Sequence, residues 1–126
     1  MIIYILTSDK NNWLIKGMQY CIKKYWHKHP PVKILGYSKL NFKLEKGFQF
    51  ISLGVDKGPN HVNKDLELFF SKVKVNNFIF TVDDFWPIRK INTEIMKEFK
   101  NIIETKKIGR IAMNGHVKTK PFNLFK

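Results

Sequence analysis

The sequence MIIYILTSD at residues 1–9 decides the fold, because an apolar run of strand length ends there in a polar turn. The Ile-rich run at residues 2–7 predicts a strand. Apolar residues then recur at the spacing of one helix face, which predicts a helix over about residues 10–28. Ser8 or Asp9 can cap its start, and a pair of prolines prevents its continuation. The first unit is therefore strand, turn and helix.

The rest of the chain continues to alternate strands and helices. The predicted elements are, in order, strands at 32–37 and 48–53, a helix that Asn63 can cap, a strand at 77–82, a helix at about 92–105 and a strand at 108–113. The run at 77–82 is nearly continuous in apolar character, as in a central strand covered on both faces. The order βαββαβαβ predicts one α/β domain over residues 1–115 with a mostly parallel sheet, followed by a basic tail at 116–126.

The length and composition permit one folded domain. A chain of 126 residues has room for a single core, and its 44% hydrophobic residues supply the surface that such a core buries. Cys21, the single cysteine, cannot form an internal disulfide and is expected to be a buried thiol. The first residues lack the basic leader of a signal peptide, and no apolar run reaches the ~18 residues that span a bilayer. We therefore expect a cytoplasmic location.

The formal net charge of +13 favours anionic partners. Nucleic acid, nucleotide phosphates, anionic glycans and acidic lipid all fit this charge. Of the 23 basic residues, 21 are Lys, and only Arg89 and Arg110 offer a guanidinium fork for guanine. This balance weakens a role in reading DNA bases.

An acidic pair, Asp83-Asp84, follows the predicted strand at 77–82. Two adjacent carboxylates repel each other unless a cation or hydrogen bonds offset the repulsion. Adjacent side chains of a strand point apart, so one carboxylate can reach a Mg²⁺ or Mn²⁺ ion while the other meets a ribose or an amine. A structural role in a turn or helix cap is the alternative. Ligands of open α/β sheets bind beyond the carboxyl ends of the strands, where this pair, Thr7-Ser8-Asp9 and the loop 54–61 all lie in the predicted order.

The segments Tyr4–Asp9 and Phe78–Asp84 together resemble the nucleotide half of a GT-A glycosyltransferase. The resemblance covers roughly residues 1–115. It implies a three-layer α/β/α Rossmann-like domain that uses Mn²⁺ or Mg²⁺ to bind a nucleoside diphosphate sugar, with UDP as the favoured nucleotide. The implied activity is hexosyl transfer from the UDP-sugar donor, or hydrolysis of the sugar from it.

The same resemblance implies roles for individual residues. Asp84 would be the metal ligand, joined by His116, and Asp83 would contact ribose or the donor sugar; the two aspartates are the catalytic candidates. The other candidates for binding the nucleotide sugar are Thr7, Ser8, Asp9, Lys10, Asp56, Lys57 and Gly58. Lys10 and Lys57 would meet phosphate. Val82 stands where the family often has a first acidic residue, so the roles of the two aspartates could be exchanged.

The acceptor half of that family, which often supplies a catalytic base, is almost absent from the sequence. The acceptor could be a glycan, a lipid-linked molecule or another anionic molecule. Two other functions therefore stay open: a non-catalytic subunit that binds a nucleotide sugar, and a basic module that binds nucleic acid. Trp13 is expected in the core rather than stacked on a base, and Trp86 could form a sugar platform or cover the end of the sheet.

Overall fold

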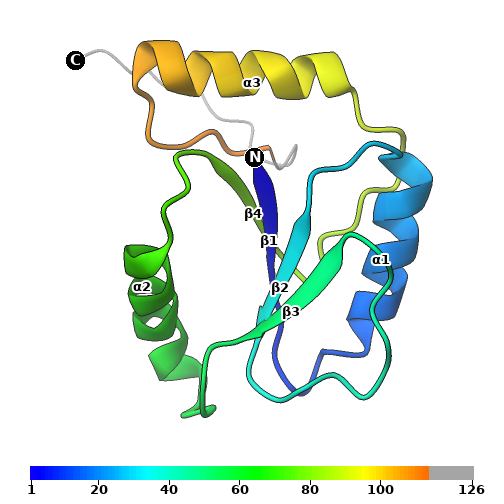
Figure 1. The fold of residues 1–126 in the computed structure, drawn as a ribbon, viewed down its shortest axis with the longest axis vertical. Coiled ribbons are helices and arrows are strands. Elements are labelled where there is room, and N and C mark those ends of the chain that lie inside the picture. The colour runs from blue at the N-terminus through cyan, green and yellow to red at the C-terminus, as the bar shows by residue number, and fades with distance from the viewer. Residues whose placement is uncertain (114–126) are drawn as a thin grey trace. The chain divides into compact units, whose positions relative to one another are not determined.

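The computed structural model describes residues 1–113, in which Met1–Ile91 form one compact unit and Asn92 begins a second. The first unit contains, in order, β1 (Ile2–Leu6), α1 (Leu14–Tyr25), β2 (Val32–Gly36), β3 (Phe48–Ser52), the 3₁₀ turn η1 (Pro59–His61), α2 (Val62–Lys72) and β4 (Phe78–Val82). The second unit contains α3 (Thr93–Lys106). Figure 1 gives these elements in their order along the chain. The expected tail at 116–126 lies outside the described residues.

The four strands form one parallel sheet in the order β3-β2-β1-β4, which confirms an α/β fold and is compatible with a Rossmann-like fold. Ile5 of β1 is in register with Ile34 on one side and Thr81 on the other. β1 is a central strand, and its middle residues Ile3, Tyr4 and Ile5 are buried. Near-continuous burial of this kind is typical of a parallel strand covered on both faces.

The expectation that the strand at 77–82 is central was wrong. β4 is an edge strand of the sheet in the described part of the chain, with Phe78 and Phe80 exposed at 40% and 43%. Its apolar run reflects packing of its two aromatic rings against Phe70 of α2, as in the stack of Phe70 on Phe78 at a centroid distance of 4.7 Å. A run of apolar residues shows that a strand packs well and does not by itself place that strand in the centre of a sheet.

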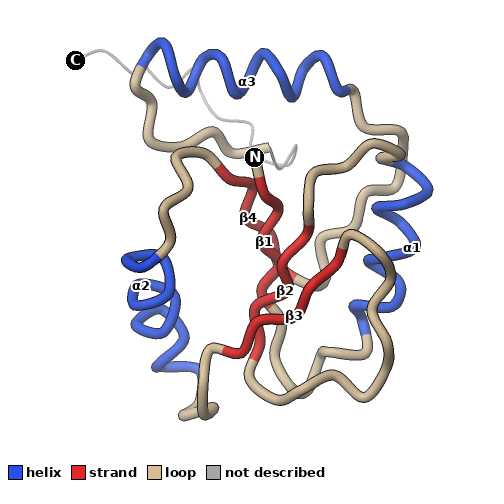
Figure 2. The backbone as a smooth tube through the Cα atoms, in the orientation of Figure 1, coloured by secondary structure: helices blue, strands red, loops and turns tan. Residues whose placement is uncertain are grey.

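Helices α1 and α2 lie on opposite sides of the sheet (Figure 2). Helix α1 buries Ile15, Met18 and Ile22, and each such side chain contributes roughly 1.5–3 kcal/mol of hydrophobic stabilisation. On the side of α2, Tyr4 of β1 meets Phe69 and Phe70 edge to face, with ring centroids 5.6 and 5.3 Å apart. No helix of residues 1–113 has the length and apolar character needed to cross a membrane.

Two details of the predicted first helix were wrong. Helix α1 begins at Leu14 without a side-chain cap, because its capping position is Trp13 rather than Ser8 or Asp9. The Asp9 carboxylate accepts hydrogen bonds from the backbone N–H and hydroxyl of Ser38. Trp13 is 65% exposed rather than in the core. At 100° per residue it projects about 160–180° away from Ile15 and Ile22, which lie on the buried face.

The later elements differ from the expectation at their ends. Asn63 lies within the first turn of α2, which begins at Val62 after η1 and has no side-chain cap. Helix α3 begins close to the expected position, and the Asn92 side chain caps it by accepting hydrogen bonds from the N–H groups of Glu94 and Ile95 at 3.0 and 3.2 Å.

The predicted strand at 108–113 was wrong, because these residues form no strand in the structure. Lys107 ends α3 in the left-handed conformation, with φ of 51°. The residues that follow include Gly109 and Ala112, which have low strand propensity. A strand also needs a neighbour for its backbone hydrogen bonds, and the described sheet ends at β4 on one side and β3 on the other.

Candidate functional site

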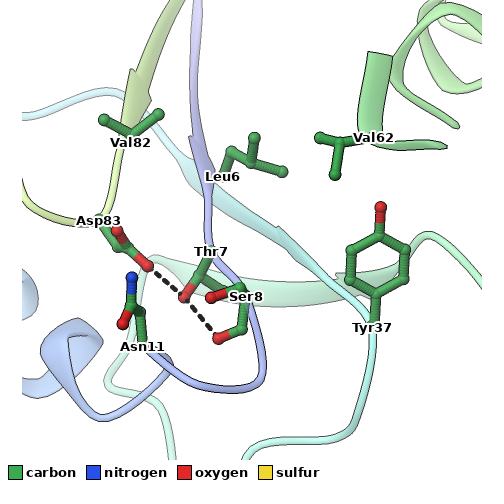
Figure 3. Close-up of a pocket in the computed structure, with 8 residues that line it drawn as sticks. All are labelled: Leu6, Thr7, Ser8, Asn11, Tyr37, Val62, Val82 and Asp83. Atoms are coloured by element: carbon green, nitrogen blue, oxygen red, sulfur yellow. Dashed lines mark hydrogen bonds between the residues drawn. The ribbon is translucent and has the colours of Figure 1, made fainter. Parts of the chain in front are cut away.

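The order of the strands creates a switch point at the carboxyl ends of β1 and β4. From β1 the chain passes to β2 and β3 on one side, then returns through α2 to β4 on the other side of β1. Ligands of open α/β sheets bind at such switch points, because the connections leave the sheet in opposite directions and open a crevice. A hollow of about 170 Å³ lies there, lined by Leu6, Thr7, Ser8, Asn11, Tyr37, Val62, Val82 and Asp83 (Figure 3).

A buried hydrogen bond between Thr7 and Asp83 joins the two strand ends. The Thr7 hydroxyl donates to Oδ2 of Asp83 at 2.7 Å, and the two residues are only 4% and 6% exposed. The carbonyl of Ser8 lies farther from the same hydroxyl, at 3.4 Å, so the single Thr7 proton belongs to the carboxylate. The N–H of Asp83 donates to the carbonyl of Leu6 at 3.0 Å and extends the β1–β4 ladder by one residue. Asp83 is thus held through both its backbone and its side chain, and among residues 1–113 the hydrogen bond to its carboxylate is made at Oδ2, not Oδ1.

The residues after Asp83 form a tight turn. The N–H of Phe85 donates to the carbonyl of Val82 at 3.1 Å, and the indole N–H of Trp86 donates to the carbonyl of Asp83 at 2.5 Å. This turn leaves Asp84 exposed at its apex, next to a buried carboxylate. The two aspartates therefore have different surroundings, as expected from their adjacent positions at the end of a strand.

Trp86 packs on α1 at Gly17. A Cβ atom on Gly17 would lie 2.4 Å from the Cη2 atom of the Trp86 ring, so only glycine admits the ring at this distance. The structure places the Trp86 ring between this turn and α1, and both roles expected for it, a sugar platform and a cover for the end of the sheet, stay predictions. The ring fixes the turn that carries Asp83 and Asp84 against the first helix.

Tyr37 lines the hollow from the end of β2 and donates a hydrogen bond to Oδ2 of Asp65 at 2.9 Å. Burial, the hydrogen bond to Asp65 and the charges of Asp65 and Asp56 raise the pKa of Tyr37 to about 12. Its hydroxyl is therefore neutral over the physiological range. Sequence reasoning missed both Tyr37 and Asn11. The position of Tyr37, the last residue of the predicted strand at 32–37, is the signal that could have found it.

The hollow brings together only some of the predicted site residues. Thr7, Ser8 and Asp83 line it. Asp9, Lys10, Asp56, Lys57 and Gly58 are not among its lining residues, and Asp84 lies beside it on the surface. Asp56 accepts a hydrogen bond from the N–H of Gly58 at 2.8 Å, where a φ of 91° favours glycine. His116 lies outside the described residues.

The carboxylates available to a metal ion at the switch point are those of Asp83 and Asp84. Within residues 1–113, no group of three or more His, Cys, Asp or Glu side chains could hold a metal ion. A Mg²⁺ ion at a diphosphate needs fewer protein ligands, since one or two carboxylates are completed by phosphate oxygens and water. The oxygen donors present therefore fit a metal that arrives with a diphosphate.

No protein-family model, curated protein or solved structure matches the chain. Its function therefore has to be argued from the geometry of the switch point and from the motifs that lie there.

Proposed function

We propose that this chain is a GT-A-type glycosyltransferase domain that binds a nucleoside diphosphate sugar, with UDP as the nucleotide, together with Mn²⁺ or Mg²⁺. One observation carries the proposal: the buried Thr7–Asp83 hydrogen bond at the switch point, with the exposed Asp84 beside it. The three-layer α/β/α Rossmann-like arrangement is part of the proposal. Helices on opposite sides of the sheet and the strand order β3-β2-β1-β4 support it.

The size of the hollow indicates which part of the donor it takes. Sites that enclose a drug-sized ligand have roughly 300–1,000 Å³, whereas this hollow has about 170 Å³. It is large enough for a ribose or a base and too small for a whole nucleotide sugar. We therefore assign the nucleoside to the hollow, with Oδ1 of Asp83 accepting from a ribose hydroxyl, and the diphosphate and sugar to the open surface near Asp84.

The reaction would transfer the sugar from the diphosphate to an acceptor hydroxyl. The bond between the anomeric carbon and the diphosphate oxygen breaks, the acceptor oxygen bonds to the same carbon, and the acceptor proton passes to the departing diphosphate. A bound divalent ion would supply stabilisation of the negative charge on the departing diphosphate. Lys10 and Lys57, in the loops after β1 and β3, are exposed and free to approach the same phosphates.

Calorimetric titration tests the proposal. UDP and UDP-sugars are titrated with and without Mn²⁺ into the wild type, Asp84→Asn and Thr7→Val. We expect UDP binding that Mn²⁺ strengthens. Asp84→Asn should weaken the Mn²⁺-dependent binding at least tenfold because it removes the metal-binding charge, and Thr7→Val should weaken binding with and without Mn²⁺ because Asp83 loses its fixed orientation. Glu67→Gln, an exposed carboxylate on α2, is the matched control and should bind as the wild type does.

The two remaining hypotheses make different predictions in the same experiments. A module that binds nucleic acid would take up single-stranded RNA or DNA with strong salt dependence and no UDP, and this outcome would refute the proposal. A non-catalytic subunit would bind the UDP-sugar and release no sugar from it. Measuring free sugar after incubation of the UDP-sugar with the protein and Mn²⁺ separates this case from an active transferase.

A further inference from the structure

The outward face of α1 presents aromatic rings and lysines together. Trp13 and Tyr20 are 65% and 61% exposed, although large aromatic side chains are usually buried. They lie seven residues apart, so they project from the same side of the helix, about 10 Å apart along its axis. Lys16 and Lys24 are exposed on the same side. These four residues, which we term the α1 face, lie opposite the buried face of the helix.

The lysines of the α1 face have no acidic neighbours on their own helix, since α1 contains no Asp or Glu. The Nζ atom of Lys24 lies 5.4 Å from the ring centroid of Tyr20, and that of Lys16 lies 5.0 Å from the ring centroid of Phe42. Lys23 is ion-paired with Glu45 in the loop before β3 and so adds little net charge. The flank of α1 at Lys23 is thus occupied by the chain itself, and the Trp86 ring covers Gly17 on the outward side, whereas the four side chains of the α1 face stay exposed.

We infer that the α1 face binds the surface of a lipid bilayer that contains anionic lipids. The rings of Trp and Tyr are favoured at the boundary between headgroups and acyl chains, because one part of each side chain is apolar and the other is polar. Lysines beside them meet the negative surface potential, and their aliphatic stems can lie along the rings while the ammonium group stays in water. The contact is shallow, since the apolar stripe of α1 is buried in the protein core.

The composition of this face favours lipid over nucleic acid. Proteins that bind nucleic acid use the guanidinium fork of Arg for phosphates and for stacking on bases. The two arginines of the chain, Arg89 and Arg110, both lie outside α1. The inference does not depend on the proposed transferase activity, because the hollow at the switch point contributes none of the four residues.

Co-sedimentation with vesicles tests the inference. We expect the wild type to bind vesicles of phosphatidylcholine and phosphatidylserine and not vesicles of phosphatidylcholine alone. Each lysine lost near such a surface weakens binding about fivefold, so Lys16→Gln with Lys24→Gln should weaken it on the order of 25-fold. The matched control is Lys64→Gln with Lys72→Gln, which removes the same charge from α2, on the other side of the sheet, and should cause a much smaller loss.

A second pair of variants separates the aromatic contribution from charge. Trp13→Ala with Tyr20→Ala should weaken vesicle binding without changing net charge, whereas Leu68→Ala, an exposed apolar residue of α2, should not. Far-ultraviolet circular dichroism verifies that each variant is folded. The inference is overturned if both lysine pairs cause equal losses, or if phosphatidylserine does not promote binding. It is equally overturned if the α1-face variants abolish binding to single-stranded oligonucleotides while the wild type ignores vesicles.

Discussion

Replacing Thr7 by Val perturbs the candidate site at its most buried point. Valine has nearly the shape of threonine, so the change removes the hydroxyl and keeps the methyl group that packs beside Gly36. The Asp83 carboxylate, only 6% exposed, then loses the donor that lies 2.7 Å from its Oδ2 atom. A hydrogen bond to a charged group contributes about 1.5–3 kcal/mol, and a buried acceptor left without its donor loses that amount. We therefore expect Thr7→Val to lower the free energy of unfolding by about 2 kcal/mol.

Urea denaturation at neutral pH, followed by circular dichroism, measures this loss. A double-mutant cycle with Asp83→Asn isolates the interaction, because an asparagine oxygen still accepts from Thr7 but carries no charge. In the Asp83→Asn background, Thr7→Val should cost about 1 kcal/mol less than in the wild type. Ser71→Ala, which changes an exposed hydroxyl on α2, is the control and should stay within about 0.5 kcal/mol of the wild type.

The reasoning is refuted if Thr7→Val changes the free energy of unfolding by less than about 0.5 kcal/mol, because a hydrogen bond between two buried groups cannot be that weak. Equal costs in both backgrounds would refute it too, since they would show that the hydroxyl does not interact with the charge of Asp83.

Three further predictions concern the surroundings of the site and the second unit. Gly17→Ala gains about 1 kcal/mol of helix propensity but places a Cβ atom 2.4 Å from the Trp86 ring, so the ring must move away. Hydrogen exchange of the amides in the turn after Asp83 should then become faster, while the free energy of unfolding changes by less than about 1 kcal/mol. The raised pKa of Tyr37, about 12, means that folding favours its neutral form. This contribution to stability is complete below pH ~10 and is lost as the pH rises from ~10 to ~12. Asp65→Asn should lower the pKa of Tyr37, measured by ultraviolet titration of tyrosine ionisation, with Tyr37→Phe identifying its signal. Asn92→Ala removes the N-terminal cap of α3 and should destabilise this helix by about 1 kcal/mol. The measurement is hydrogen exchange, which should become faster at the amides of Glu94 and Ile95, the two donors to the Asn92 side chain.

The alternation of apolar runs and amphipathic stretches was enough to predict the class of fold and four of the five strands. Leu14, Met18 and Ile22 recur at helical spacing and were enough to predict α1, although its buried face also contains Ile15 and Gln19. The position of β4 in the sheet could not be predicted in this way. A strand rich in Phe has the same sequence pattern whether it lies between two other strands or at the edge of the sheet with its rings packed on α2. Trp13 was misplaced since its spacing is close to the apolar pattern, while the helix itself begins one residue later.

The rule that ligands bind at the carboxyl ends of strands was enough to select Thr7, Ser8 and Asp83, which the structure brings to one hollow. The rule could not distinguish the side chains that line the hollow from those that form hydrogen bonds within or between the loops. Asp56 accepts a hydrogen bond from the N–H of Gly58 in its own loop, and Asp9 accepts one from the N–H of Ser38 in the loop after β2. Short polar side chains in turns readily accept from backbone N–H groups, and the sequence does not show which partner they choose. Tyr37 was missed because the candidate residues were taken from the segments at the ends of the strands at 2–7, 48–53 and 77–82, and none from the end of the strand at 32–37.

The central claim is that UDP and a divalent ion bind together at the switch point, and nuclear magnetic resonance of the ¹⁵N-labelled chain tests it most directly. Paramagnetic Mn²⁺ broadens the amide signals of residues near it. We predict that UDP shifts the amides of Ser8, Asn11 and Tyr37, and that a trace of Mn²⁺ then broadens those of Asp84 and Phe85 only while UDP is present. If UDP leaves the spectrum unchanged, or if the broadened amides lie away from the ends of β1 and β4, the assignment of this site to a nucleotide sugar is contradicted.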